Sequence, residues 1–311
     1  MQAIVLTQPG GVENLVIQDI KRPSIKPGEL LIKVEALSIN PVDIKTRNGE
    51  GIYGRIKDEQ PLVLGWDISG IVVESLHDNF KVGDQVFGMV NFPGHGKAYA
   101  EYVAADGSQL VKKPANISHQ NAAAATLVAL TAWQALVTNA KIQKNQKVLI
   151  HAASGGVGHI AVQIAKHLGA TVVGTSSEKN KDFVLKMGAD QHINYHNYNW
   201  TDHPKEFDVV LDTIGGENIE HSLKVTKKGG SIISIPTGLN EQITQKAASQ
   251  GVKAYFILVE SSGVDMAKIA TLLESGVIKP QIFKTYEFNQ IKQAHLQQET
   301  GRTVGKLIIT T

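Results

Sequence analysis

The sequence contains no cysteine among its 311 residues. Disulfides, thiol nucleophiles, iron–sulfur clusters and thiolate zinc sites are therefore excluded, and any redox chemistry has to come from a bound cofactor. An excess of one charge is also absent, because 31 Lys and Arg face 29 Asp and Glu and leave a net charge of +2. This near-neutrality argues against nucleic acid as the main partner.

Long apolar runs are missing as well. The most apolar stretch, residues 122–137, is shorter than a membrane span and contains Thr126, Thr131 and Gln134, so it predicts a buried helix. The first residues lack the basic and apolar regions of a secretory signal and alternate like a strand. We expect a cytoplasmic protein without membrane contact, whose 42% hydrophobic residues fill roughly two domain cores.

Two patterns divide the chain. The first part holds short strand-like runs between Pro- and Gly-rich turns, which is typical of an irregular antiparallel barrel: residues 30–37, 70–76, 84–90 and 98–105. After residue 118, apolar strands alternate with helices, which is typical of a doubly wound parallel sheet: residues 147–153, 170–176, 207–215 and 231–236. The last residues again have a strand-like pattern, at 305–310. The sequence predicts an α/β protein in which a domain of residues 118–265 is inserted into a β-rich domain of residues 1–117 and 266–311.

A glycine-rich turn over residues 147–170 is the most informative segment. An apolar strand is followed by Ala152, Gly155 and Gly158 at spacings of three, and then by a helix with apolar residues at i, i+3 and i+4. Small residues let the backbone approach a pyrophosphate, and the helix N-terminus offers free N–H groups to it. A plain tight turn is the alternative. The expected contacts are Ser154, Gly155, Gly156, Val157 and Gly158.

The next strand distinguishes the two nicotinamide cofactors. Glu178 stands 20 residues after Gly158, as in sites selective for NAD, but it follows the strand end by several residues. Hydroxyls at the strand end, with lysines just after, suit a 2′-phosphate better. We therefore expect NADPH, held by Ser176, Ser177, Lys179 and Lys181. The alternative is that Ser177 caps the next helix and the lysines are only solvated.

Several sequence blocks, in this order, resemble the medium-chain dehydrogenase/reductase superfamily and, within it, the zinc-free quinone oxidoreductase branch. They are SINPVDIKTRNG (38–49), LVLGWDISGIV (62–72), VGDQVFG (82–88), AYAEYV (98–103), AAAATLVALTAWQAL (122–136), ASGGVG (153–158), MGADQHINY (187–195), DTIGG (212–216) and GKLI (305–308). The resemblance implies a GroES-like catalytic barrel, a Rossmann NADP-binding domain and a homodimer.

The zinc alcohol dehydrogenases of this superfamily differ at their metal ligands. They carry Cys-x-x-Asp where this chain has Asn40 to Asp43, and Gly-His-Glu where it has Gly65, Trp66 and Asp67. The resemblance therefore implies metal-free hydride transfer from NADPH to a quinone or an α,β-unsaturated carbonyl. Two alternatives stay open: a catalytically silent NADPH-binding sensor or scaffold, and an alcohol dehydrogenase with an unfamiliar metal site made by Asp43, Asp67 and His95.

The resemblance also implies candidate catalytic residues. Asn40 would donate to the substrate carbonyl, Asp43 would order the site, and Tyr53 would supply a proton or a hydrogen bond. Asn-Pro also starts turns, and Tyr53 also fits an amphipathic aromatic on the surface.

Further cofactor contacts are expected at strand ends. Tyr195 matches the family tyrosine near the adenosine end, although a strand-edge aromatic is the alternative. Thr213, Ile214 and Pro236 follow two parallel strands at the edge where open α/β sheets bind ligands.

Overall fold

The computed structural model describes residues 1–311, which divide into two compact units. Unit 1 consists of residues 1–130 and 259–311, and unit 2 of residues 131–258. These divisions lie away from the predicted boundaries at 117/118 and 265/266. The reason is local packing, because α3 (His119–Ala124) lies against the strands of unit 1, and α9 (Gly263–Glu274) packs beside the turn before β7.

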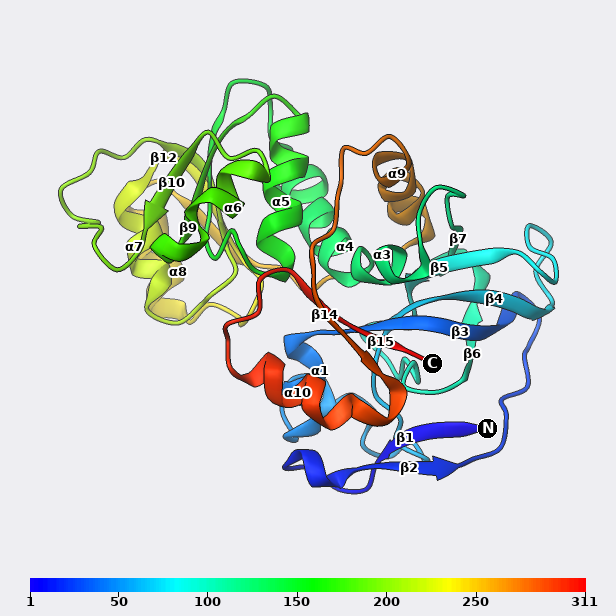
Figure 1. The fold of residues 1–311 in the computed structure, drawn as a ribbon. Helices are drawn as coiled ribbons and strands as arrows, with labels where there is room; N and C mark the ends of the chain where they lie inside the picture. The colour runs from blue at the N-terminus through cyan, green and yellow to red at the C-terminus, as the bar shows by residue number, and fades with distance from the viewer. The chain divides into compact units, whose positions relative to one another are not determined.

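Unit 1 is built on a seven-stranded sheet in the order β14-β15-β3-β4-β5-β7, with β6 paired to β3 (Figure 1). All its strand pairs are antiparallel except β14 with β15, as expected for an irregular barrel. Two further strands, β1 (Gln2–Leu6) and β2 (Leu15–Asp19), form a separate antiparallel pair. The seven are β3 (Glu29–Ile39), β4 (Asp67–Ser75), β5 (Gln85–Met89), β6 (Tyr102–Asp106), β7 (Val111–Lys112), β14 (Ile282–Glu287) and β15 (Lys306–Thr310).

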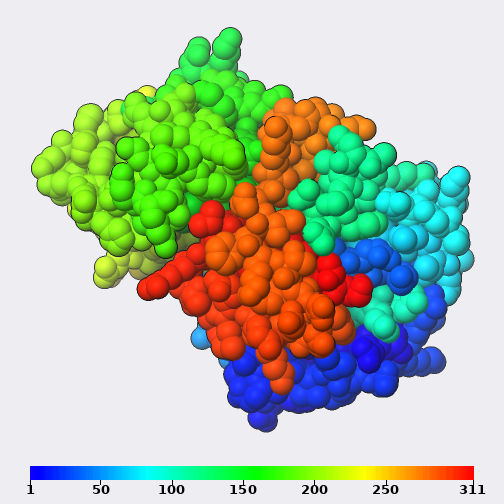
Figure 2. Space-filling view, viewed as in Figure 1, coloured from blue at the N-terminus to red at the C-terminus, as the bar shows by residue number.

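Both ends of the sequence contribute to unit 1. The late strand β15 pairs antiparallel with β3, and α10 (Ile291–Glu299) lies against α1 (Pro41–Arg47). Figure 2 shows the resulting surface, on which the orange and red late residues adjoin the blue early ones. A short helix, α2 (Tyr53–Ile56), follows α1.

The single buried helix predicted for residues 122–137 is wrong. The structure has α3 ending at Ala124, α4 (Leu127–Trp133) and a π-helical turn over Gln134–Asn139. The break has a local cause: Thr126 Oγ1 bonds back to the Ala123 carbonyl at 2.9 Å, and the Leu127 N–H is taken by the Asp67 carboxylate at 2.9 Å. A side chain distant in sequence therefore starts α4, which the local pattern does not reveal.

Unit 2 holds a six-stranded sheet, all parallel, in the order β10-β9-β8-β11-β12-β13. Its strands are β8 (Lys147–Ile150), β9 (Thr171–Ser176), β10 (Gln191–Asn194), β11 (Phe207–Asp212), β12 (Thr226–Ser234) and β13 (Lys253–Phe256). Its helices are α5 (Gly156–His167), α6 (Lys181–Lys186), α7 (Asn218–Val225) and α8 (Glu241–Ser249).

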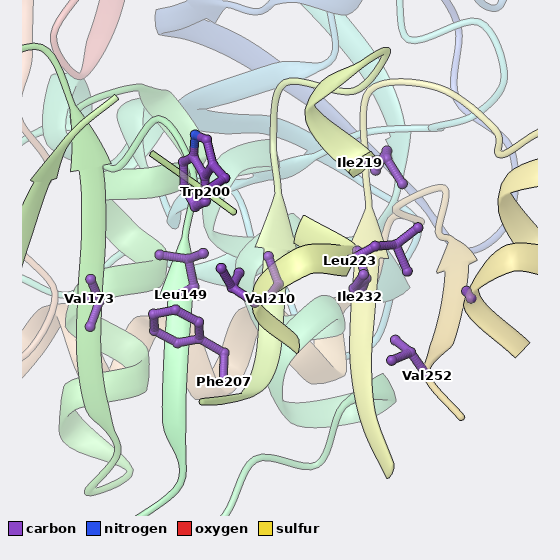
Figure 3. Packing of buried hydrophobic residues seen from close by; sticks show 11 residues of the cluster. Leu149, Val173, Trp200, Phe207, Val210, Ile219, Leu223, Ile232 and Val252 are labelled. Carbon is purple, nitrogen blue, oxygen red and sulfur yellow. The ribbon is translucent and has the colours of Figure 1, made fainter. Parts of the chain in front are cut away.

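Helices cover both faces of this sheet. On one face, Leu149, Val173 and Val210 of the strands pack with Leu223 of α7 and with Trp200 (Figure 3). On the other face, a Cβ on Gly174 would meet Val184 of α6 at 2.6 Å. The doubly wound parallel sheet is thus confirmed. No helix of the molecule combines the length and apolarity that a membrane crossing requires.

Candidate functional site

The glycine-rich turn joins β8 to α5 with a close backbone approach. A Cβ on Gly158 would lie 2.2 Å from the Ala152 carbonyl oxygen, so only glycine fits there. Ala152 itself has φ of 45°, in the left-handed region that non-glycine residues rarely adopt. Gly155 precedes α5 as its N-cap residue and provides no side-chain cap, so the first N–H groups of this helix are free for an external acceptor.

Side chains at the ends of β8, β9 and β11 hold this edge of the sheet together. Thr175 Oγ1 accepts from the Ala152 N–H at 3.2 Å, and Thr213 Oγ1 donates to the His151 carbonyl at 2.8 Å. His151 is buried between Thr175 and Ser222. Burial lowers the pKa of His151 to about 4, so the ring is neutral and structural.

The loop after β9 lies against the glycine-rich turn. Asn180 Nδ2 donates to Ser154 Oγ at 3.1 Å. Ser176 Oγ is 2.8 Å from Nε2 of His192 on β10. Sequence reasoning missed both Asn180 and His192. His192 stands in the block MGADQHINY, but the block gives no partner for it, and Asn180 stands in no block; strand order alone would have placed His192 beside β9.

The other predicted cofactor residues lie at the same carboxyl edge with different exposure. Lys179 and Lys181 are exposed, and Lys181 pairs with Glu178 at 3.8 Å. Tyr195 is 46% exposed and Ile214 is 50% exposed, so both are accessible to a ligand. Ser177, Thr213 and Pro236 are half-buried, while Ser176 is buried.

Unit 1 contains a buried polar cluster, formed by Ser38, Asn40, Asp43, Asp67 and Lys306, all less than 4% exposed. Asn40 Nδ2 donates to Asp67 Oδ2 at 2.7 Å, and Lys306 Nζ donates to Asn40 Oδ1 at 2.5 Å. Ser38 also donates to Asp67. The Asn40 amide is therefore held at both its nitrogen and its oxygen within the protein.

Asp43 caps the start of α1 from inside this cluster. Its Oδ2 accepts from the Asn40 N–H at 2.6 Å, whereas its Oδ1 is buried without a hydrogen-bond partner. Burial raises the pKa of Asp43 to about 7, and the nearby Asp67 charge adds to this rise. Asp43 therefore titrates near neutral pH.

A second buried network adjoins α1. Arg47 Nη1 lies 3.4 Å from His295 Nδ1, and Tyr99 Oη lies 3.0 Å from His295 Nε2. Since arginine only donates, Nδ1 accepts and the Nε2–H donates to Tyr99. Burial and the Arg47 charge lower the pKa of His295 to about 3, so this ring stays neutral.

Tyr53 and His95 stand apart from the buried polar cluster. Tyr53 begins α2 and is half-buried, and no hydrogen bond joins it to Asn40 or Asp43. His95 Nε2 lies 2.8 Å from the Val63 carbonyl oxygen, which fixes the loop that carries it. His95 is thus placed as a loop anchor rather than beside Asp43 and Asp67.

Comparisons with known proteins identify the family. The family model described as "Alcohol dehydrogenase GroES-like domain" matches residues 26–115, and the one described as "Zinc-binding dehydrogenase" matches residues 187–309. The chain is 34% identical to the mitochondrial NAD(P)H oxidoreductase RTN4IP1 of Bos taurus, over 99% of the chain and 89% of that relative. The chain belongs to the quinone oxidoreductase branch of the medium-chain dehydrogenase/reductase superfamily.

Two further similar proteins support this family assignment. The chloroplastic NADPH-dependent alkenal/one oxidoreductase of Arabidopsis thaliana is 32% identical, over 99% of the chain and 79% of that relative. The quinone oxidoreductase structure from Coxiella burnetii aligns with a TM-score of 0.93 at 35% identity, over 100% of the chain and 99% of that chain. The predicted fold and family are confirmed, and the chain is an oxidoreductase of the kind that uses a nicotinamide cofactor.

The residues present do not fit the zinc ion that one family description mentions. Where the zinc enzymes of the superfamily place ligands, this chain has the Asn40 amide, which already bonds Asp67 and Lys306. The Lys306 ammonium, 4.0 Å from Asp67, would repel a second cation in the buried polar cluster.

Proposed function

We propose that this enzyme is an NADPH-dependent reductase that transfers hydride to a quinone or an α,β-unsaturated carbonyl without a metal. The observation that supports it most is the glycine-rich turn, where the bare Cα of Gly158 lets α5 start against Ala152. Relatives named quinone oxidoreductase and alkenal/one oxidoreductase support the class of acceptor. The bound dinucleotide would supply the hydride from its nicotinamide ring.

The free N–H groups at the start of α5, those of Gly156, Val157 and Gly158, would hold the pyrophosphate. Gly155 would line the phosphate through its backbone only, because its N–H already donates to the Ala152 carbonyl at 2.8 Å. Ser154 would stay oriented by Asn180. At the nicotinamide end, Thr213, Ile214 and Pro236 would position the ring. Thr213 and Ile214 follow β11, and Pro236 follows β12, at the ligand-binding edge of the sheet.

The loop after β9 would bind the adenosine end. Ser176 and Ser177 would present the strand end to the ribose, Lys179 and Lys181 would pair with the 2′-phosphate, and Tyr195 would cover the base. This charge pattern supports NADPH over NADH.

In unit 1, we assign Asn40 and Asp43 a positioning role, since both are fully buried and bonded to neighbours. Together with Lys306 they would hold α1 and the residues after it in place. Tyr53, which is half-buried on α2, is the candidate group of this segment for hydrogen bonding to the acceptor.

The activity is tested by following NADPH oxidation with a panel of quinones and enones. Turnover above background on at least one class supports the proposal. Tight NADPH binding without turnover on any acceptor contradicts it and favours a silent sensor.

Cofactor choice is tested by replacing both Lys179 and Lys181 with Ala. The double variant should weaken NADPH binding by about 1–3 kcal/mol and leave NADH nearly unchanged, because only NADPH carries the phosphate. Lys186→Ala, an exposed lysine on α6, is the matched control. Equal weakening of both cofactors would reject the assignment.

A homodimer and a cytoplasmic location complete the proposal. Light scattering during gel filtration reports the mass of the assembly, and a monomer at micromolar concentration would overturn the dimer. Fractionation of the source cells tests the location.

A further inference from the structure

His192 lies on β10, beside the end of β9 from which the loop proposed to bind the 2′-phosphate starts. This strand runs beside β9 (Figure 1) and pairs with it in parallel. Asn194 is the register partner of Ser176. His192 Nε2 is 2.8 Å from Ser176 Oγ, and the residue is half-buried. The imidazole therefore supports the strand end from which the phosphate loop starts.

The hydrogen bonds of Ser176 indicate which ring nitrogen of His192 carries the proton. Ser176 Oγ donates to the Ser177 carbonyl oxygen at 3.0 Å, and a hydroxyl has only one proton to donate. Ser176 Oγ therefore accepts from the Nε2–H of His192. Nδ1 is then the atom of the neutral ring that can take up a second proton.

Charged groups of the loop face this ring. Partial burial lowers the pKa of His192, the Glu178 carboxylate and the Ser176 backbone raise it, and the Lys181 ammonium lowers it. The free ring is thus neutral at neutral pH. A dianion bound nearby would favour the charged form.

The loop is short of positive charge for a phosphate. Lys181 pairs with Glu178 at 3.8 Å, which leaves Lys179 as its unpaired cation. A phosphate monoester carries about −1.5 to −2 charges at neutral pH. A second cation is therefore needed close to Ser176 and Ser177, and His192 is placed to supply it.

We propose that His192 is a specificity-determining residue for NADPH, which takes up a proton when the 2′-phosphate binds and so supplies the second positive charge. The inference rests on the proposed function, because it requires the 2′-phosphate to lie in this loop. Its consequence is a cofactor preference that depends on pH. NADPH should be favoured over NADH most strongly below neutral pH and less at alkaline pH.

The test measures dissociation constants of NADPH and NADH by protein fluorescence between about pH 6 and pH 8, the range of histidine titration. In the wild type, the preference for NADPH should fall by about fivefold across this range, the size of one charge-assisted contact. The phosphate's own ionisation near pH 6 acts in the opposite direction, so each variant is compared with the wild type.

Three variants separate the effects. His192→Gln keeps a donor toward Ser176 without the charge and should lose this pH-dependent fall, whereas His192→Arg should keep the preference at every pH. His167→Gln, an exposed histidine on α5, should behave as the wild type does. A His192→Gln variant with the wild-type pH profile overturns the proposal.

Calorimetry in buffers of different ionisation enthalpy gives a second readout on the wild type. At about pH 7.5, where the 2′-phosphate is already almost fully ionised, NADPH should bind with more proton uptake than NADH; equal uptake at this pH overturns the proposal even if His192→Gln folds poorly. Failure of the proposed function looks different. In that case the wild type binds both cofactors equally at every pH, and removal of Lys179 and Lys181 has no selective effect.

Discussion

At the scale of single residues, Gly158 carries the greatest constraint in unit 2. Its Cα faces the Ala152 carbonyl so closely that a methyl group would sit 2.2 Å from the oxygen. This position follows from the sequence pattern, because a turn that brings a helix against a strand needs a small residue there.

Replacing Gly158 with Ala should abolish tight cofactor binding and destabilise unit 2 by about 1–3 kcal/mol, because α5 must move away from the turn. Thermal unfolding and cofactor titration measure both effects. Gly54→Ala on α2, where nothing lies within 4 Å, should leave both unchanged. Wild-type cofactor affinity in the Gly158 variant would contradict the assigned close approach.

Lys306 is a residue whose role the sequence did not reveal. It is 266 residues from Asn40, yet its ammonium donates to the Asn40 side chain and to the Ile39 carbonyl. The closing GKLI block indicated family membership but gave no partner. For Asn40 the sequence suggested a substrate contact, and only the three-dimensional structure shows that the protein occupies its amide.

Replacing Lys306 with Met should destabilise unit 1 by about 3–5 kcal/mol, because Asp67 then remains buried without its counter-charge. Adding Asp67→Asn should recover part of this loss. Urea unfolding of the single and double variants measures the coupling, with Lys268→Met on the exposed face of α9 as the control. A double variant as unstable as the sum of the single ones would show that no coupling exists.

At the scale of elements, strands were predicted more accurately than helices. The apolar runs at 147–153 and 207–215 contain β8 and β11, because period and β-branched residues are local properties. The break between α3 and α4 depends on Asp67, which is far away in sequence. Nothing in the run of alanines indicates it.

The start of α1 should make stability depend on pH through Asp43. Its pKa is about 3.8 in the unfolded chain and about 7 when buried, so the folded state keeps a proton that the unfolded chain releases. The stabilising contribution of the protonated Asp43 carboxyl to the free energy of unfolding is therefore fully present below about pH 4. It is lost as pH rises to about 7.

Asp43→Asn keeps the acceptor for the Asn40 N–H but cannot ionise. It should gain stability relative to the wild type as pH rises through this window, which urea unfolding at several pH values measures. Parallel stability profiles for the two proteins would contradict the titration of Asp43.

At the scale of the whole molecule, the two-part plan was predictable because the sequence pattern changes twice. Short strands between turns give way to alternating strands and helices, and the last residues are strand-like again. The divisions observed lie near residues 130 and 259, since α3 packs on the barrel strands and not on the parallel sheet. Packing between helices and sheets decides such domain boundaries, and the composition of the sequence does not show which helix packs on which sheet.

Each unit also contains a buried neutral histidine, His295 in unit 1 and His151 in unit 2, with pKa values lowered by burial to about 3 and about 4. Both rings must take up a proton when the chain unfolds below the ordinary histidine pKa of 6.5. Their contribution to stability is complete above that pH and is lost as pH falls toward 4 and 3.

Both units should therefore lose stability in mild acid. His295→Gln should lose less free energy of unfolding between about pH 7 and pH 5 than the wild type does, because a glutamine does not protonate. Circular dichroism during urea unfolding measures this, with the exposed His167→Gln as control. If the His295 variant lost as much free energy of unfolding between about pH 7 and pH 5 as the wild type, His295 would be excluded as a cause of the acid destabilisation.

The distance along the chain between Asn40 and Lys306 has a consequence for synthesis. Lys306 stands 266 positions after Asn40, and at ribosomal rates of about 5–20 residues per second this length takes on the order of tens of seconds to make. During that time the carboxylate of Asp67 has no ammonium to neutralise it and remains in water. We expect the contiguous residues 131–258 to fold first on the ribosome, and the barrel to close only when β15 emerges.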